Sequence, residues 1–323
     1  MNSRKISAIL IALFMILVVS GSSPAMANFP SGTMRIIVPF AAGGSTDLMA
    51  RILAPAMASR LGGIDIIVEN RAGGGGAIGV TELLRLPADG YTLLLASPNA
   101  AILTPILSDV GYSNEDLAPI ARVSELPTNI FVNADSEIET FADLIRLAEE
   151  NPGRLTYSTS GTGSIHHVVA ELFQHVGGRQ GLLTHVPFSS GTEGVTAVLG
   201  GHVYMTFANA SYGESFVREQ GLMRVIVTSG EEGCPILPDI PTFTSFGYDV
   251  TLASWWGFLT RAGTPDEVLD LLDETIRDAM SDPAVLEGFA TIGMIPSYMG
   301  RTGFTEKYLI QYYQLKDVLA ELF

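Results

Sequence analysis

The sequence predicts an α/β fold made of two doubly wound lobes joined by a hinge. Apolar runs of strand length alternate with helical stretches, an order that favours parallel strands linked by right-handed crossovers. Two glycine-rich loops of similar chemistry, residues 40–47 and 157–164, each follow a predicted strand and open a helix. About 296 residues remain when a predicted export signal of 27 is subtracted from the 323, which is enough for two hydrophobic cores.

The export signal is predicted to occupy residues 1–27. Arg4 and Lys5 supply its positive charge, residues 6–19 its apolar core, and Ala25-Met-Ala27 a small-x-small cleavage site. Because this core is shorter than the roughly 18 apolar residues of a membrane span, we expect cleavage near Ala27 instead of a membrane anchor. No later apolar run is long enough to span a bilayer, so the mature chain is expected to be soluble.

The first lobe is expected to begin with alternating strands and helices. The predicted strands are 34–38, 64–68 and 91–96, with one helix beginning at Ser45 or Thr46 and another over 77–86. The run 34–38 is rich in Ile and Val, which is typical of a strand buried on both faces. Ser45 or Thr46 is a suitable N-cap, and Asp47 lies in the first turn, where the helix dipole favours an acid. Pro55 is expected to kink or interrupt this helix.

The second lobe is expected to follow a first crossing near Pro127, which separates predicted strands 120–123 and 129–132. Its other predicted elements are helices 141–150, 165–176 and 193–199 and strands 155–158, 183–186 and 203–207. Strand 224–228 is expected to return the chain to the first lobe, before strand 255–259 and helices 265–280 and 305–322. The predicted division is therefore 28–123 plus 225–323 for the first lobe and 124–224 for the second.

Charge and cysteine content exclude several classes of protein. The formal net charge is −16, and it becomes −18 without Arg4 and Lys5, so non-specific binding to nucleic acid or to an anionic membrane is excluded as a function. Attraction of an anionic ligand must then come from local dipoles. Cys234 is the only cysteine, so the chain has no internal disulfide and packing alone must stabilise it.

The two glycine-rich loops are predicted to bind a small anion. A helix start presents unpaired backbone N–H groups with partial positive charge, glycines allow close approach, and hydroxyls add donors. The candidate residues are Phe40, Ala42, Gly43, Gly44, Ser45 and Asp47 in the first loop and Ser160, Gly161, Thr162, Gly163 and Ser164 in the second. Phe40 and Phe188 each border a loop and are candidates to cover the carbon chain of the ligand. For either loop alone, a tight turn without a ligand remains the alternative.

No cofactor or metal site is expected. The first loop has neither the dinucleotide-binding spacing nor a nucleotide P-loop, and residues 74–79 match G-x-G-x-x-G only because a run of glycines satisfies many patterns. His166 and His167 are adjacent and so lie on different faces of a helix. The remaining histidines show no metal-binding spacing.

A secreted hydrolase is a weaker alternative. It would use Ser160 or Ser164 with His167, but Gly161 stands where a G-x-S-x-G elbow requires serine. We therefore expect no catalytic residues.

Of the adjacent Trp255 and Trp256, one is expected in the core and the other is a candidate for a cleft wall.

Short motifs spread over nearly the whole mature chain match one protein family. They are Arg35-Ile-Ile-Val-Pro-Phe-Ala-Ala-Gly-Gly-Ser-Thr-Asp47 and the segments 68–76, 87–93, 152–158, 161–164, 185–188, 200–203, 237–242 and 263–265. With these motifs the chain resembles the Bug family, the extracytoplasmic solute receptors of tripartite tricarboxylate transporters.

The resemblance implies a monomeric, type II-like periplasmic binding protein that closes on a small carboxylate and delivers it to permease subunits in the membrane. It implies that the ligand carboxylate meets loops 40–47 and 158–164, partly through ordered waters, with Phe188 to Gly191 as a further wall. A module that presents its ligand to a membrane sensor is a second alternative. The chain departs from the family at Phe188-Ser-Ser-Gly191, where Tyr-Lys-Gly is usual, and at Tyr204, where Asp is usual. Both departures concern the distal end of the ligand.

Overall fold

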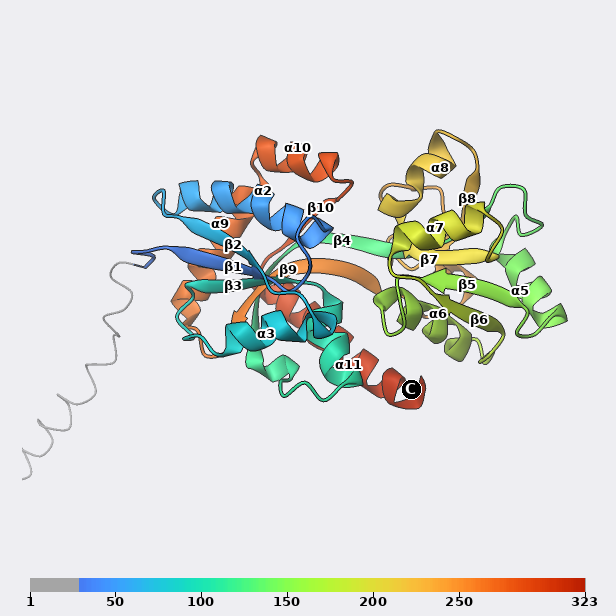
Figure 1. Cartoon of the computed structure of the whole chain (residues 1–323), viewed down its shortest axis with the longest axis horizontal. Helices are drawn as coiled ribbons and strands as arrows, with labels where there is room; N and C mark the ends of the chain where they lie inside the picture. The colour runs from blue at the N-terminus through green and yellow to red at the C-terminus, as the bar shows by residue number, and fades with distance from the viewer. Residues whose placement is uncertain (1–28, 323) are drawn as a thin grey trace, which may run out of the picture.

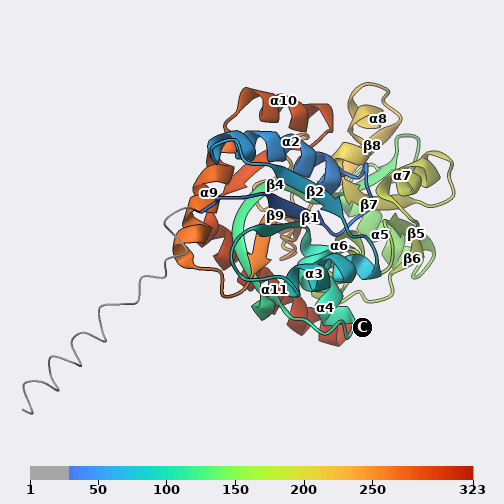
Figure 2. The same cartoon turned by 60° about the vertical axis from the view of Figure 1, so that its left-hand side comes forward.

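The computed structural model describes residues 29–322 and confirms the α/β fold with two lobes (Figures 1 and 2). The predicted signal peptide and its cleavage site lie outside the described residues. Within 29–322, no helix combines the length and the apolar character needed to cross a membrane.

One path of hydrogen-bonded strands runs through both lobes in the order β2-β1-β3-β9-β4-β7-β5-β6, and β8 and β10 also pair with β4. The strands are β1 Met34–Val38, β2 Ile66–Asn70, β3 Thr92–Ala96, β4 Leu117–Asn133, β5 Leu155–Thr159, β6 Leu183–Pro187, β7 Met205–Asn209, β8 Met223–Thr228, β9 Ala253–Arg261 and β10 Pro296–Met299. As the strand–helix order predicts, β1 is parallel to β2 and β3, and β5 is parallel to β6 and β7. The strands that join the lobes, β4 and β9, are antiparallel to their neighbours.

Helices cover both faces of this sheet (Figure 1). The longer helices are α2 Ser45–Arg60, α3 Ala77–Leu84, α5 Phe141–Glu150, α6 Ile165–Val176, α7 Gly191–Leu199, α9 Asp266–Met280, α10 Pro283–Thr291 and α11 Arg301–Leu322. Successive side chains of β1 point to opposite faces: Ile36 packs in the cluster formed with α2 and α9, and Ile37 in the cluster formed with α3 and α11. This double burial explains why β1 is apolar at every position except Arg35, which is exposed.

Strand β4 is a single strand and not the two strands expected on either side of Pro127. Its first part pairs with β9, and its last part pairs with β7 and β8. Pro127 lies where the pairing partner changes, so its missing N–H interrupts neither ladder. The strand therefore passes from the first lobe to the second without a break.

The contacts of residues after 225 favour a later return of the chain to the first lobe than the boundary predicted near residue 225. Strand β8 pairs with the second-lobe part of β4. Phe243, beyond it, packs with its ring centroid 5.5 Å from Phe141 of α5 and 5.5 Å from Phe173 of α6. We therefore propose lobes of 29–127 plus 253–322 and of 128–252.

Helix α2 also differs from expectation in two details. It runs through Pro55 without interruption, because Pro55 lies on the exposed side, where water can hydrate the carbonyl it leaves unpaired. Its N-cap is Gly44 and not Ser45 or Thr46, so both of those residues lie inside the first turn with their amide groups directed beyond the helix start.

Candidate ligand-binding site

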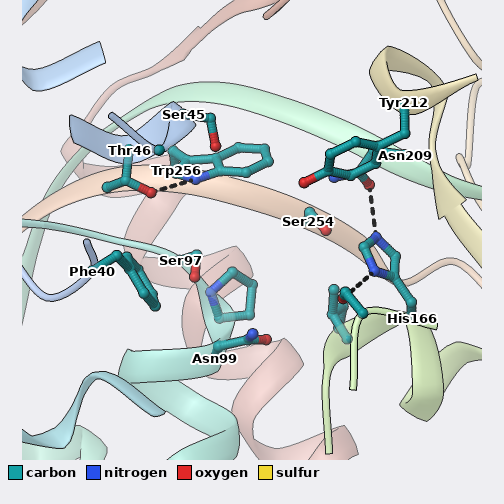
Figure 3. A pocket seen from close by; sticks show the side chains of 14 residues that line it. Phe40, Ser45, Thr46, Ser97, Asn99, His166, Asn209, Tyr212, Ser254 and Trp256 are labelled. Carbon is teal, nitrogen blue, oxygen red and sulfur yellow. Dashed lines mark hydrogen bonds between the residues drawn. The ribbon is translucent and has the colours of Figure 1, made fainter. Parts of the chain in front are cut away.

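A cavity of about 200 Å³, called here the interlobe cavity, lies between the two lobes (Figure 3). Its wall is formed by Phe40, Gly44, Ser45, Thr46, Ser97, Pro98, Asn99, Ser160, Ile165, His166, Asn209, Tyr212, Ser254 and Trp256. Most of these residues follow the carboxyl end of β1, β3, β5 or β7, the edge at which open α/β sheets bind ligands. The starts of α2 and α6, one from each lobe, both contribute to the wall.

The start of α2 supplies hydrogen-bond donors to the cavity. The amides of Ser45 and Thr46 are in the first turn and have no intrahelical partner. Trp256 Nε1 donates to Thr46 Oγ1 over 3.0 Å, a bond visible in Figure 3. Because the Thr46 oxygen accepts from the indole, its own hydroxyl hydrogen remains available for a ligand.

Asp47 organises the first loop from behind the cavity wall. Its Oδ2 accepts from Gly43 N over 2.8 Å, and its Oδ1 lies 3.0 Å from both Asn70 Nδ2 and Arg51 Nη2. Burial raises the pKa of Asp47, but the hydrogen bonds from Arg51, Gly43 and Asn70 outweigh it and hold that pKa below its ordinary value. The carboxylate is thus engaged inside the protein and leaves the helix start open to another anion.

On the side of the second lobe, three side chains form a hydrogen-bonded chain. His166 Nδ1 lies 2.9 Å from Ser160 Oγ, and His166 Nε2 lies 3.1 Å from Asn209 Oδ1. Burial lowers the pKa of His166 to about 4, although the bond to Asn209 opposes this, so the ring is neutral near pH 7.

Two further histidines support the second loop from below. Gly163 N donates to His167 Nδ1 over 3.1 Å, and Thr159 Oγ1 lies 2.8 Å from His185 Nε2. The two imidazole rings stack with centroids 4.0 Å apart, and the ring of Tyr157 also stacks with that of His185 at 5.0 Å. Burial lowers the pKa of both His167 and His185 to about 4. Neutral imidazoles therefore fix the shape of the 159–163 turn.

No side chain in the described wall of the interlobe cavity belongs to Asp, Glu, Lys or Arg. The wall offers hydroxyls, amides, a neutral imidazole and two helix starts. Such a site stabilises an anion through dipoles instead of ion pairs. Within residues 29–322, no group of three His, Cys, Asp or Glu side chains is placed to hold a metal ion.

The structure brings only part of the predicted residue set to the cavity. Phe40, Gly44, Ser45 and Ser160 line it. The predicted residues outside its wall are Ala42, Gly43, Asp47, Gly161, Thr162, Gly163, Ser164, Phe188 and Gly191.

Several of the residues outside the wall have a structural role next to it. Ser164 is the N-cap of α6, and its Oγ accepts from His167 N over 3.3 Å. A Cβ on Gly191 would lie 2.6 Å from the ring of Tyr212, so a glycine there lets Tyr212 reach the cavity.

Other cavity residues were not selected from the sequence. They are Ser97, Pro98, Asn99, Ile165, His166, Asn209, Tyr212 and Ser254. The position of Ser97 directly after β3, and of Asn209 at the end of β7, is a signal that could have identified them. Of the tryptophan pair, Trp256 lines the cavity, whereas Trp255 packs against Phe304 at 5.0 Å in the core.

Comparison with known proteins gives consistent matches. A family model described as the tripartite tricarboxylate transporter family receptor matches residues 49–313. Protein BugT of Bordetella pertussis is 32% identical over 273 residues, which cover 83% of this chain and 82% of BugT. A TctC solute binding protein from Polaromonas has a similar structure, with a TM-score of 0.83 and 24% identity over 91% of this chain and 100% of that one. R. palustris Rpa4515, solved with adipate, has a TM-score of 0.73 and 25% identity over 90% of this chain and 97% of that one.

Proposed function

Because the chain belongs to the tripartite tricarboxylate transporter receptor family, and so is a solute-binding protein of the TctC and Bug type and not an enzyme, we propose that it captures a small organic carboxylate in the interlobe cavity. The observation that carries this proposal is that the starts of α2 and α6 open on one cavity whose described wall holds no charged side chain. A carboxylate there accepts hydrogen bonds from the Ser45 and Thr46 amides and from nearby hydroxyls.

The energies involved are compatible with useful affinity. A micromolar dissociation constant requires about 8 kcal/mol. Hydrogen bonds to a charged group contribute about 1.5–3 kcal/mol each, so a few of them with the apolar cover of Phe40 and Trp256 reach this value after ordering costs. The adipate bound by the relative Rpa4515 is an acid of the same class.

We further infer from family membership that the protein is periplasmic, is released by cleavage near Ala27, acts as a monomer and passes its ligand to permease subunits in the membrane. Ligand contacts from both lobes favour the closed arrangement, because those contacts form only when the lobes meet. Closure then provides the signal by which a permease distinguishes loaded from empty receptor.

The chain Ser160–His166–Asn209 contains residue types found in hydrolases. Asn209 supplies no negative charge to stabilise a protonated imidazole, and burial keeps the pKa of His166 at about 4. With the family membership, this argues for a role in ligand binding.

A thermal-shift experiment on protein dialysed free of ligand tests the function. The panel contains mono-, di- and tricarboxylates, with the corresponding uncharged amides as controls. A ligand at one hundred times its dissociation constant stabilises the folded state by about 2.7 kcal/mol, so at least one acid is expected to raise Tm clearly while its amide does not. A panel of acids without any shift would contradict the proposal.

A further inference from the structure

One segment of the first lobe connects the interlobe cavity with the surface of the second lobe. Its first residues, 97–99, line the cavity, and it continues through a π-helical turn, Asn99–Leu103, directly into α4 Thr104–Leu107. Such π-helical turns are rare and are frequently found at functional sites. At the other end of the segment, Leu107 contacts the second glycine loop, because a Cβ placed on Gly163 would lie 3.2 Å from Leu107 Cδ1.

Three hydroxyl groups hold this segment in place within the first lobe. The hydroxyls of Tyr112 and Tyr308 donate to two consecutive carbonyls of the π-helical turn, over 2.7 and 3.2 Å. Thr104 Oγ1 donates to Gly75 O over 3.0 Å, and a Cβ on Gly75 would come within 2.5 Å of that hydroxyl oxygen. The glycine run to which Gly75 belongs therefore makes room for the segment, which presents Leu107 from a fixed position.

The surface that Leu107 contacts is a turn of defined shape. Gly163 has φ +74°, a conformation that glycine adopts without steric cost, and its N–H donates to His167 Nδ1. The sequence predicted that this turn binds the ligand, but it lies outside the cavity wall. A second contact between the lobes, where a Cβ on Gly293 would lie 3.6 Å from Ser211 Cβ, involves a small exposed side chain with less apolar surface to bury.

We propose that Leu107 is a latch between the lobes, whose side chain docks on the Gly163 turn and favours the arrangement in which the lobes meet. Hinge opening exposes to water the apolar surface that the turn covers, and this exposure opposes opening. Because residues 97–99 of the same segment line the cavity, a bound ligand contacts the element that carries the latch. Ligand and latch then stabilise the same arrangement. The effect on ligand affinity rests on the carboxylate binding proposed above, whereas the latch itself does not.

Distance measurements on ligand-free protein test the latch. Nitroxide labels are attached through Arg85→Cys in the first lobe and Glu150→Cys in the second, both at exposed positions, while the buried Cys234 is left in place. In Leu107→Ala we expect the distribution of distances between the labels to shift and broaden, and the radius of gyration from small-angle X-ray scattering to increase. An unchanged distribution and an unchanged radius would overturn the proposal.

Two control variants separate a latch from a general packing effect. Leu86 is also half-buried against the same apolar cluster, but its carbonyl accepts from Arg261 within the first lobe. Leu86→Ala should therefore leave the label distances of the parent protein unchanged. Leu107→Met keeps the volume of the side chain and should also retain them. Equal shifts in Leu86→Ala and Leu107→Ala would mean that the lobes respond to loss of packing in general, and the latch would be refuted.

The effect on binding is measured by calorimetric titration with adipate, succinate and citrate. An acid that binds the parent protein should bind Leu107→Ala about threefold or more weakly, because the arrangement that binds is populated less, and should bind Leu86→Ala as it binds the parent. Equal affinities for the parent and Leu107→Ala would refute the coupling of the latch to binding. If none of the three acids binds the parent, the proposed function fails for them, and the label distances alone decide the latch.

Discussion

At the scale of single residues, the proposed site presents neutral groups held in fixed orientations to an anion. The indole of Trp256 donates to Thr46 Oγ1 over 3.0 Å, which leaves the hydroxyl hydrogen of Thr46 available beside the free amides of α2. Asp47, the acid closest to this helix start, is occupied by Gly43 and Arg51. Because these groups carry no net charge into the cavity, their dipoles supply the attraction for an anion that the net charge of −16 does not.

Replacing Ser45 by proline isolates one main-chain donor. Proline is tolerated in the first turn of a helix, and Gly44 before it already has φ −75° and ψ 164°, the extended conformation that proline requires. Ser45→Ala removes the hydroxyl but keeps the amide and is the matched control. We expect Ser45→Pro to weaken carboxylate binding about tenfold more than Ser45→Ala in calorimetric titration, because a hydrogen bond to a charged group contributes about 1.5–3 kcal/mol.

Equal affinities of the two variants, with circular dichroism spectra like that of the parent protein, would show that the Ser45 amide does not contact the ligand. The proposal would then have to place the carboxylate at α6 or at the hydroxyls of the wall.

At the scale of elements, the second glycine loop depends on the helix and strands beneath it. The rings of His167 and His185 stack under the loop, and His167 Nδ1 accepts from Gly163 N. The contact from Gly163 N requires a neutral His167 ring, since a protonated Nδ1 cannot accept a hydrogen bond. The loop is therefore shaped by imidazoles that stay neutral while the protein is folded. Its conformation should for this reason depend on pH.

Stability should fall as the pH is lowered from 6.5 toward 4. In the unfolded chain these histidines bind protons below about pH 6.5, whereas burial holds the pKa of His166, His167 and His185 at about 4 in the folded protein. For His185 the neighbouring His167 adds to the effect of burial and Glu171 opposes it. Unfolding therefore takes up protons in this window, and acid favours it. We expect Tm by calorimetry to be clearly lower at pH 5 than at pH 7.

The variant His185→Gln serves as control for the pH dependence. Glutamine stays neutral and can still bond Thr159, so the loss of Tm between pH 7 and pH 5 should be smaller than in the parent protein. Asp47 does not contribute in this window, because its pKa lies below its ordinary value of 3.8. A Tm that is constant or higher at pH 5 would show that protonation of these rings does not oppose folding.

Elements with local signals could be predicted from the sequence, and those that depend on tertiary pairing could not. Helix α5 has the predicted bounds, because Thr140 and Asp143 form a capping box at its start and Pro152 follows its end. Most of the site residues that sequence analysis selected lie on the two glycine loops, because a strand followed by glycines and a helix start is also a local signal. Ser254 enters the cavity only because β9 pairs with β4, and no local pattern reports that pairing.

At the scale of the whole molecule, the two lobes are connected by strands instead of flexible linkers. Strand β4 belongs to the sheets of both lobes (Figure 1). Ser229 ties the crossings together, since its Oγ accepts from Thr128 N over 3.0 Å and donates to Leu252 O. One cluster of buried apolar residues also contains side chains of both lobes, among them Leu259 and Phe173. Hinge bending must therefore occur within a continuous hydrogen-bonded region.

This connection predicts that the lobes unfold together. Both tryptophans of the chain, Trp255 and Trp256, lie in β9 of the first lobe, so tryptophan fluorescence reports that lobe, whereas far-ultraviolet circular dichroism reports both. In guanidinium titrations of ligand-free protein the two signals should give the same midpoint, because loss of either sheet removes the pairing partners of β4. A bound carboxylate should move both midpoints upward by the same amount, since in the proposed site it contacts both lobes. A dichroism transition at lower denaturant without a change in fluorescence would mean that the second lobe unfolds alone, and that β4 does not couple the lobes.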